Sequence, residues 1–270
     1  MAKVAFSVDA GIINRLGLEL VAKSETALAE LIKNAYDADA NVVSLYFENA
    51  DSEGGSLTIE DDGAGMDKTQ LIKGFMRLAT TDKLHNSISK QYNRPKAGRK
   101  GIGRFSTQRL GKRLEIITQA ENKKTAHKLV INWDDYRTDK EISQVTNELN
   151  VVIKGRPKGE GTTLLISDLR EKWSDADIRR VYRYVAELIQ PDLLKVGAGG
   201  TVVTEAKKEG FEVRFFRRNL PTEDWAIVAD PQVMLLDRAL ATFSGYIDSK
   251  GYGHCKVESK GFTFEGRKKD

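Results

Sequence analysis

One predicted helix combines a buried face with a row of polar side chains, and it constrains the fold more than any other segment. The sequence predicts that this helix begins at Ser24, which we expect to be its N-cap, and ends within residues 37–40. Glu30, Asn34 and Asp37 are spaced i, i+4 and i+7, so at about 100° per residue they share one face. The apolar residues centre on a stripe roughly 140° away and are Leu28, Leu31, Ile32 and Ala35.

The apolar stripe is the face that a core would cover, and the polar row beside it indicates a wall of a polar pocket. A solvated helix face is the simpler interpretation of three aligned polar residues. The choice between the two depends on what the rest of the chain places next to this helix.

The composition is that of an ordinary globular chain with a sizeable core. The 270 residues are 40% hydrophobic and 30% charged, which leaves room for one large domain or two modest ones. The formal net charge of +4 is small against 43 basic and 39 acidic residues, so the overall charge does not predict a nucleic-acid partner. A single cysteine, Cys255, excludes an internal disulfide and any multi-cysteine metal site.

The chain shows neither a secretory signal nor a membrane span. Its start lacks a charged head followed by a long apolar run. No stretch approaches the roughly 18 to 20 apolar residues that a span needs. We therefore expect a cytoplasmic protein without a membrane partner.

Helix and strand patterns divide the chain into two parts. The expected strands are 42–47, 57–60, 114–118, 128–133, 151–154, 162–167, 211–216 and 242–247. The further expected helices are 68–78, 104–110 and 175–190. Residues 79–100 lack periodicity, and a loop of this length inside a compact domain is often a functional lid. We expect a domain boundary near residue 191, and the strand-like end of the chain suggests a fragment of a longer protein.

A short acidic and glycine-containing segment follows the strand expected at 57–60. Asp62 stands where the chain leaves the sheet, and Gly63 and Gly65 let backbone approach a ligand without a Cβ in the way. A plain turn is the simpler interpretation. A calcium loop fits poorly, because the alternating oxygen ligands and the later Glu are missing.

A basic glycine-rich segment precedes the helix expected at 104–110. Gly98, Gly101 and Gly103 are spaced i, i+3 and i+5, so successive free N–H groups and a helix start form a phosphate cradle. The Walker pattern and the dinucleotide-binding fingerprint are both absent. The 94–113 stretch carries eight basic residues and no acidic one, which favours phosphate on a nucleotide or a polymer, with a flexible basic loop as the alternative.

Taken together, these segments resemble the GHKL superfamily of ATPases, which includes gyrase B, the ninety-kilodalton heat-shock chaperones, MutL and the MORC family. The family's motif E-x-x-x-N-x-x-D-A is matched by the helix that starts at Ser24, through Glu30, Asn34, Asp37 and Ala38. The resemblance covers about residues 10–170.

The other motifs of the family also match. D-x-G-x-G is matched by Asp61, Gly63 and Gly65, so Asp62 is the variable position between them. G-x-x-G-x-G is matched by the glycines at 98, 101 and 103, and Thr162 at the head of a strand is similar to the fourth motif.

The resemblance implies an α+β fold, a two-layer α/β sandwich in which helices cover a mixed β-sheet, known as the Bergerat ATP-binding fold. It assigns residues 1–191 to this GHKL-type ATP-binding domain. Residues 192–270 would form a β-rich second domain or the truncated start of a transducer domain.

The resemblance also implies roles for the polar row of the helix. Glu30 would be the general base that orients and deprotonates the attacking water. Asn34 would supply a neutral oxygen to Mg²⁺, whose other ligands are typically waters and phosphate oxygens. Asp37 would help to order the pocket.

Base and phosphate contacts complete the implied site. Asp61 would accept a hydrogen bond from the adenine amino group, and Thr162 would support this contact. The motif glycines Gly63 and Gly65 would lie beside the base, and Met66 would pack against it. The residues implied at the phosphates and the lid entry are Thr81, Lys83, Gly98, Lys100, Gly101, Ile102, Gly103, Arg104 and Phe105, with Lys100 adding a cation.

These assignments predict an ATPase that uses ATP and Mg²⁺ for a lid and dimerisation switch, with a homodimer forming on ATP binding. A histidine-kinase-like phosphotransferase is the first alternative, and Glu30 argues against it because such kinases pass phosphate to a histidine. A nucleic-acid-associated ATPase module is the second alternative. Relatives receive a catalytic Lys or Arg from the following domain, and no motif in 192–270 identifies one, so we expect weak hydrolysis by this chain alone.

Overall fold

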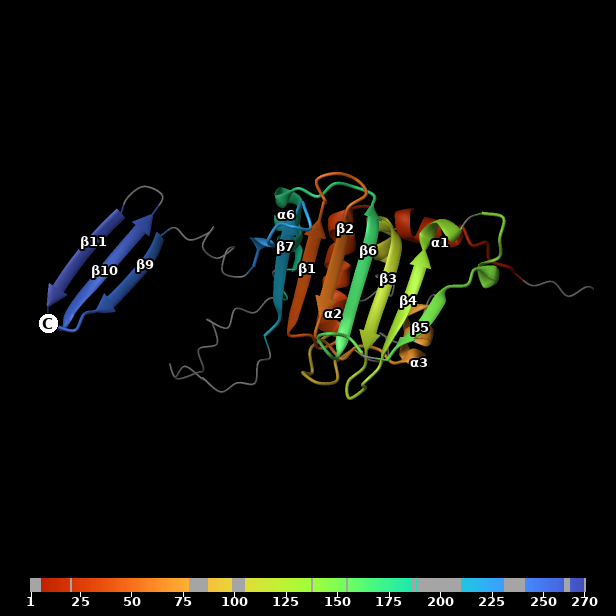
Figure 1. The fold of residues 1–270 in the computed structure, drawn as a ribbon, viewed down its shortest axis with the longest axis horizontal. Helices are drawn as coiled ribbons and strands as arrows, with labels where there is room; N and C mark the ends of the chain where they lie inside the picture. The colour runs from red at the N-terminus through yellow and green to blue at the C-terminus, as the bar shows by residue number, and fades with distance from the viewer. Residues whose placement is uncertain are drawn as a thin grey trace, which may run out of the picture. The chain divides into compact units, whose positions relative to one another are not determined.

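The computed structural model describes residues 6–19, 21–77, 87–98, 105–136, 138–153, 155–185, 188, 210–230, 241–259 and 263–269. The chain divides into two compact units, Met1–Ala229 and Asp230–Asp270 (Figure 1), and each is described by itself. Among the described residues, no helix has the length and apolar character to cross a membrane.

The first unit contains the helices and most of the strands. Its helical segments are α1 (Ile12–Asn14), η1 (Arg15–Glu19), α2 (Ser24–Asp37), α3 (Lys68–Gln70), η2 (Leu71–Phe75), α5 (Ser106–Leu110), η4 (Trp133–Asp135), η5 (Ile142–Gln144) and α6 (Asp175–Val185). Its strands are β1 (Val42–Glu48), β2 (Ser56–Asp61), β3 (Gly111–Gln119), β4 (Ala126–Asn132), β5 (Glu148–Val152), β6 (Gly161–Leu169), β7 (Glu212–Arg218) and β8 (Ala226–Ala229).

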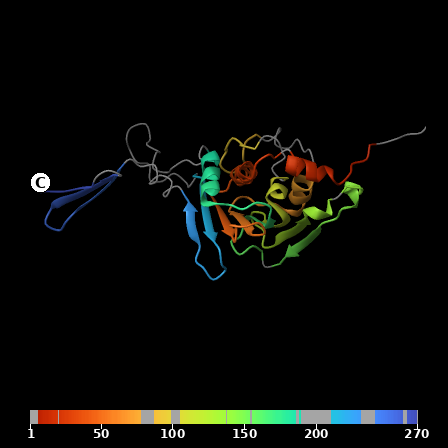
Figure 2. The ribbon, with the colours of Figure 1, turned by 90° about the horizontal axis from the view of Figure 1, so that it is seen from above.

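The strands of the first unit form one mixed eight-stranded sheet in the order β5-β4-β3-β6-β2-β1-β7-β8. The β1–β7 pair is parallel, and the other neighbours are antiparallel. Figure 2 shows the helices of this unit along one face of the sheet. This arrangement confirms the expected α+β fold, in which helices cover a mixed sheet.

Helix α2 packs on the sheet through the apolar stripe that its sequence predicted. Leu28 and Ile32 are fully buried, and Leu31 and Ala35 are nearly so. Ser24, however, is not the N-cap: the cap position is Lys23, and no side chain caps the helix start. The Ser24 hydroxyl is buried and instead donates a 2.7 Å hydrogen bond to a carboxylate oxygen of Glu171, which is the stronger acceptor.

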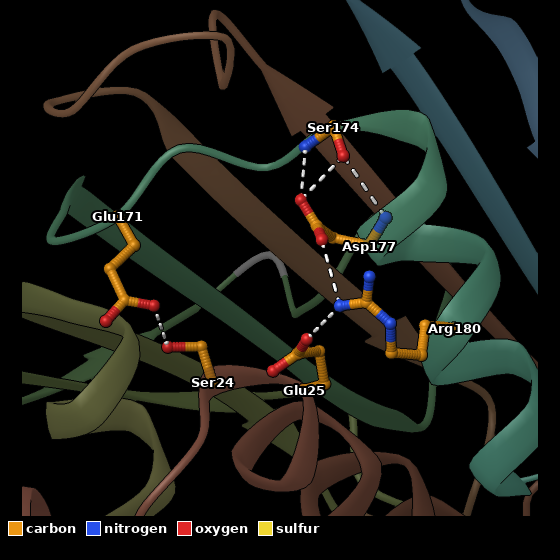
Figure 3. A network of polar contacts seen from close by, with 6 residues as sticks. All are labelled: Ser24, Glu25, Glu171, Ser174, Asp177 and Arg180. Carbon is orange, nitrogen blue, oxygen red and sulfur yellow. Dashed lines mark hydrogen bonds and ion pairs between the residues drawn. The ribbon is translucent and has the colours of Figure 1, made fainter.

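A polar network joins the start of α2 to the start of α6, as Figure 3 shows. Arg180 on α6 contacts the carboxylates of Glu25 and Asp177, and Asp177 accepts hydrogen bonds from the backbone and hydroxyl of Ser174. The two helices are therefore linked at the surface as well as through their apolar faces.

The helix-facing side of the sheet is set by the alternation of side chains along each strand. Val43, Leu45 and Phe47 of β1 are fully buried, and they pair in register with Asp61, Ile59 and Leu57 of β2. Side chains at every second position of a strand share a face, and paired residues of neighbouring strands lie on the same face. Leu57, Ile59 and Asp61 of β2 therefore face the helices together with the buried residues of β1. A carboxylate thus ends an otherwise apolar row.

The first compact unit extends beyond the boundary that we expected near residue 191. Strand β7 pairs in parallel with β1 from Val42 opposite Glu212 to Glu48 opposite Arg218, and β8 pairs with β7. These two strands therefore complete the main sheet, and the unit ends at Ala229.

Three predicted helices are described over shorter ranges than expected. The helix expected at 68–78 is one turn, α3, followed by the wider turn η2, and a reciprocal capping box between Asp67 and Gln70 starts it. The helix expected at 104–110 is α5, which begins at Ser106. The helix expected at 175–190 is described to Val185.

The second unit is an antiparallel sheet of three strands, β9 (Ala241–Ile247), β10 (Tyr252–Ser259) and β11 (Thr263–Lys269), in the order β11-β10-β9. The sequence predicted β9 and a strand-like chain end, and it did not indicate β10. In this unit the His254 ring contacts the Asp248 carboxylate at 2.9 Å and fastens the β9–β10 turn.

Candidate functional site

Three neighbouring strands bring polar side chains to one corner of the sheet. Because β6 runs antiparallel to both β2 and β3, the end of β2, the start of β6 and the end of β3 meet at the same edge. Thr118 pairs with Thr162 across β3 and β6, and Asp61 lies next to them at the end of β2. We call Asp61, Thr118 and Thr162 the Asp61 corner.

The Asp61 carboxylate is fixed through one oxygen. Its Oδ1 accepts the backbone N–H of Gly63 at 3.0 Å and that of Thr162 at 3.1 Å. Within the described part of the chain, its Oδ2 accepts no hydrogen bond from another residue.

Burial shifts the protonation of this carboxylate. It raises the pKa of Asp61 from 3.8 to about 6, against the lowering effect of the Gly63 N–H, the Arg156 charge and the Thr162 N–H. The raised pKa identifies Asp61 as a candidate for a functional site, because perturbed carboxyl groups concentrate there.

The neighbouring Asp62 contacts the backbone at the start of β1 instead of the Asp61 corner. Its Oδ1 accepts the backbone N–H groups of Asn41 at 2.8 Å and Val42 at 2.9 Å, at the start of β1. Asp62 therefore anchors a strand, and Asp61 is the carboxylate that faces the helix layer. The structure thus brings Asp61, the residue that the motif register selects, to the corner with Thr162.

Hydroxyl groups line the floor of the Asp61 corner. The Thr118 Oγ1 lies 3.1 Å from the Thr162 Oγ1 and accepts the Met66 N–H at 2.8 Å. Thr118 is fully buried. The backbone of Met66 is therefore hydrogen-bonded to Thr118, whose hydroxyl contacts that of Thr162, the residue that donates its N–H to Asp61.

Glycines allow the loop after β2 to pass close to other backbone. Gly65 has φ +59°, and a Cβ there would lie 1.9 Å from the Gln119 carbonyl oxygen. A Cβ at Gly63 would lie 2.6 Å from the Ala38 carbonyl oxygen at the end of α2. Both positions exclude a side chain, so the glycines are required by the fold of the loop itself.

The polar row of α2 is divided between two kinds of contact. Glu30 forms an ion pair with Lys33 at 2.9 Å, and both side chains are 29% exposed. Asp37 accepts the backbone N–H of Ala97 at 2.7 Å and that of Gly98 at 3.2 Å. Asn34 lies between them on the same helix and is part-exposed.

The contacts of Asp37 change the expected role of Gly98. We expected the Gly98 N–H to contact phosphate, and here it donates to Asp37. The remaining predicted phosphate and lid residues lie outside the described residues: Thr81, Lys83, Lys100, Gly101, Ile102, Gly103 and Arg104.

Phe105 lies in apolar surroundings away from the Asp61 corner. It is buried and lines a cavity of about 150 Å³ together with Phe75, Trp133 and Tyr136. The lining of this cavity includes Phe105 and none of the three residues of the Asp61 corner. A direct contact of Phe105 with nucleotide remains a prediction.

The sequence did not indicate two residues that shape the corner, Thr118 and Arg156. Thr118 ended a predicted strand, and its register opposite Thr162 is a property of strand pairing. Arg156 is a buried guanidinium that contacts the Asp61 backbone from 95 positions along the chain. Among the described residues no group of three or more His, Cys, Asp or Glu side chains could hold a metal ion on its own.

A mixed sheet with helices on one face, and an aspartate and threonine corner next to a glycine-containing loop, define a GHKL-type ATPase domain. Residues 22–162 match the family described as histidine kinase-, DNA gyrase B- and HSP90-like ATPase. The match covers more than half of the chain, and the chain belongs to this family.

The chain is also similar to the DNA mismatch repair protein MutL of Wolbachia sp. subsp. Brugia malayi (strain TRS). The two are 36% identical over 75 residues, which is 27% of this chain and 12% of that protein. The similarity therefore covers a small part of the MutL sequence.

Proposed function

We propose that this chain binds ATP with Mg²⁺ at the Asp61 corner and hydrolyses it. One observation carries the proposal: the Asp61 carboxylate faces the helix layer, with Oδ1 fixed by two backbone N–H groups and Oδ2 accepting no hydrogen bond from another described residue. An ionised carboxylate in this geometry accepts a hydrogen bond from the adenine amino group. The hydroxyls of Thr118 and Thr162 supply further polar contacts to the base, and Met66 packs against it.

The polar row of α2 is suited to the reaction at the γ-phosphate. Glu30 takes the proton of the water that attacks the γ-phosphorus, and the bond to the bridging oxygen of ADP breaks. Lys33 fixes the Glu30 carboxylate in position. The products are ADP and inorganic phosphate.

The donor set on α2 suits Mg²⁺ better than a softer metal. Asn34 offers a neutral amide oxygen, and Mg²⁺ characteristically combines few protein oxygens with phosphate oxygens and waters. The absence of a larger acidic cluster among the described residues agrees with a metal that enters with the nucleotide. When bound, Mg²⁺ would neutralise charge on the phosphates.

The phosphate side of the site is ordered by Asp37. Its two hydrogen bonds to Ala97 and Gly98 fasten the start of the glycine-rich segment to the end of α2. Gly101, Gly103 and Lys100 follow directly in the sequence and would contact the phosphates. Closure of residues 79–100 over ATP, followed by dimerisation, would make the chain a conformational switch in the N-terminal part of a larger protein.

A nucleic-acid-associated ATPase is a second candidate. It rests on the similarity to a DNA mismatch repair protein and on the basic 94–113 stretch. Binding to DNA that weakens steeply with salt would support it, because phosphate contacts release counterions.

Calorimetric titration with Mg²⁺ and a non-hydrolysable ATP analogue, together with a phosphate-release assay, tests the proposal. We expect binding by the wild-type chain and slow release of inorganic phosphate. Glu30→Gln should retain binding and lose phosphate release. Phosphate that stays covalently on the protein would contradict hydrolysis and support the phosphotransferase alternative.

A further inference from the structure

We infer that Arg156 is a positioning residue that determines the base specificity of this site. It keeps Asp61 a hydrogen-bond acceptor, so that the site selects a purine with an exocyclic amino group over one with a carbonyl at the same position. The inference rests on the proposed nucleotide site at the Asp61 corner.

The Arg156 side chain is built into the frame of the corner. The residue is 5% exposed. Its Nη2 donates to the Asp61 carbonyl oxygen at 2.9 Å, and its Nε donates to the Thr163 Oγ1 at 3.1 Å. Its Nη1 donates to the Glu160 carbonyl oxygen at 2.6 Å. One guanidinium therefore connects the end of β2 to the start of β6, the two segments that fix the Asp61 carboxylate.

The backbone of Arg156 is fixed as well. Its N–H donates to the Gln119 Oε1 at 2.7 Å, and the Gln119 side chain donates to the Lys123 carbonyl oxygen at 2.6 Å. A Cβ at Gly161 would lie 2.4 Å from the Arg156 Nη1 and 2.2 Å from the Asp61 carbonyl oxygen. The guanidinium is thus packed against the corner with no room for an intervening side chain.

The partners of the Arg156 guanidinium are neutral oxygens, so its charge is not cancelled by a direct ion pair with any described residue. Three acids surround it. Glu60 is engaged by Lys158, and Asp62 is exposed and accepts the backbone N–H groups at the start of β1. Asp61 is the acid whose carboxyl is desolvated next to this uncancelled charge, and the charge favours its ionised form.

Ionisation of Asp61 decides which base the corner accepts. An ionised carboxylate accepts a hydrogen bond from the amino group of adenine, whereas a protonated one donates to the carbonyl of hypoxanthine. Burial raises the pKa of Asp61 to about 6, and Arg156 is among the groups that counteract this rise. Loss of the guanidinium charge therefore moves the carboxyl toward its neutral form near physiological pH.

Binding of ATP and inosine triphosphate (ITP), measured with Mg²⁺ from pH 5 to 8.5, tests the inference. In the wild-type chain, ATP affinity should decline as the pH falls below about 6, since protonated Asp61 loses its acceptor. Arg156→Met and Arg156→Gln should move this midpoint upward by about one pH unit. At pH 6.5 that shift weakens ATP binding about threefold, reduces the preference for ATP over ITP about tenfold and leaves ATP binding at pH 8.5 nearly unchanged.

Two variants serve as controls. Arg156→Lys retains the charge and should retain the wild-type midpoint and ATP preference. Arg170→Met removes another partly buried guanidinium, one that donates to the Gln108 carbonyl oxygen at 2.8 Å, and should not move the midpoint.

Folded Arg156→Met or Arg156→Gln protein with an unchanged midpoint and preference would overturn the inference and leave ATP binding in place. If neither uncharged variant folds, Arg156→Lys decides, because loss of the midpoint or the ATP preference in that charged variant overturns the inference. A wild-type chain that binds neither nucleotide would refute the proposed function itself, and the inference with it.

Discussion

The Asp61 carboxylate accepts the Thr162 N–H at 3.1 Å, and this hydrogen bond joins the end of β2 to the start of β6. The contact orients a partly desolvated carboxylate toward the helix layer instead of toward water. Asp61 differs from its neighbour Asp62, which anchors β1, in that burial raises its pKa to about 6 and its partner Thr162 lies on another strand of the corner.

Replacement of Asp61 by Asn should stabilise the chain at neutral pH. The native pKa of about 6 exceeds the ordinary value of 3.8, so the folded chain binds more protons than the unfolded chain between these values. Stability of the wild type therefore falls as the pH rises from about 4 to 6, by roughly 3 kcal/mol in total. Asp61→Asn removes this loss, which urea denaturation at pH 7.5 should detect.

The same experiment at pH 4 supplies the control for Asp61→Asn. There the wild-type carboxyl is protonated in the folded chain, so the two proteins should be nearly equal in stability. Asp62→Asn should be no more stable than wild type at pH 7.5, because its carboxylate anchors β1. A stabilisation by Asp61→Asn that is the same at both pH values would contradict the raised pKa.

Gly65→Ala should destabilise the chain by more than about 2 kcal/mol, since it combines backbone strain at φ +59° with a Cβ placed 1.9 Å from the Gln119 carbonyl oxygen. Gly54→Ala is the matched control, because Gly54 has φ +92° and no atom within 4 Å of the added Cβ. The Gly54→Ala variant therefore measures the cost of the positive φ alone, about 1 kcal/mol of unfolding free energy. Equal losses in thermal denaturation would show that the close approach to Gln119 is not limiting.

Ser174→Ala should reduce stability by about 1 kcal/mol through loss of the cap at the start of α6. The Ser174 Oγ donates to Asp177 at 2.6 Å and accepts the Asp177 N–H at 3.3 Å. Burial alone would raise the pKa of Asp177, but hydrogen bonds from Ser174 and the Arg180 charge hold it below its usual value.

The pH dependence separates this cap from a packing defect. The Asp177 contribution is present above pH 4 and disappears as the pH falls and the carboxylate is protonated. The cost of Ser174→Ala in urea denaturation should therefore shrink at pH 3. Ser143→Ala, which removes an exposed hydroxyl contact to Glu141, should have little effect at either pH.

Asp37→Asn should loosen the start of the glycine-rich segment. The carboxylate accepts two N–H groups, and an amide in its place can accept only through its single oxygen. Hydrogen exchange at Ala97 or Gly98 should accelerate about tenfold, the effect of losing one hydrogen bond. Glu30→Gln on the same helix should leave both exchange rates unchanged, and equal acceleration by both variants would indicate general loosening of α2.

Much of the fold and part of the site could be predicted because their signals are local. The apolar period of α2 identified its buried stripe, and the strand patterns located most of the main sheet. Asp61 could be distinguished from Asp62 by motif register, and the structure adds the physical reason: Leu57, Ile59 and Asp61 alternate along one face of β2.

The features that escaped prediction depend on contacts distant in sequence. Arg156 reaches the Asp61 carbonyl oxygen across 95 positions and binds mainly backbone oxygens, which leave no trace in residue patterns. The extent of the first unit depends on the parallel pairing of β7 with β1, which no local pattern reveals. The capping role of Ser24 was wrong because its hydroxyl meets the Glu171 carboxylate, a partner from another part of the chain.

The central claim is that the Asp61 corner binds adenine nucleotide, and the most direct measurement is calorimetric titration of the full chain with Mg²⁺ and a non-hydrolysable ATP analogue. We predict one binding site in the wild type at pH 7.5, retained in Asp62→Asn and weakened about a hundredfold in Asp61→Asn, the cost of an unmatched buried polar group. Binding that is equally strong in folded Asp61→Asn, or absent from the wild type, would contradict the account.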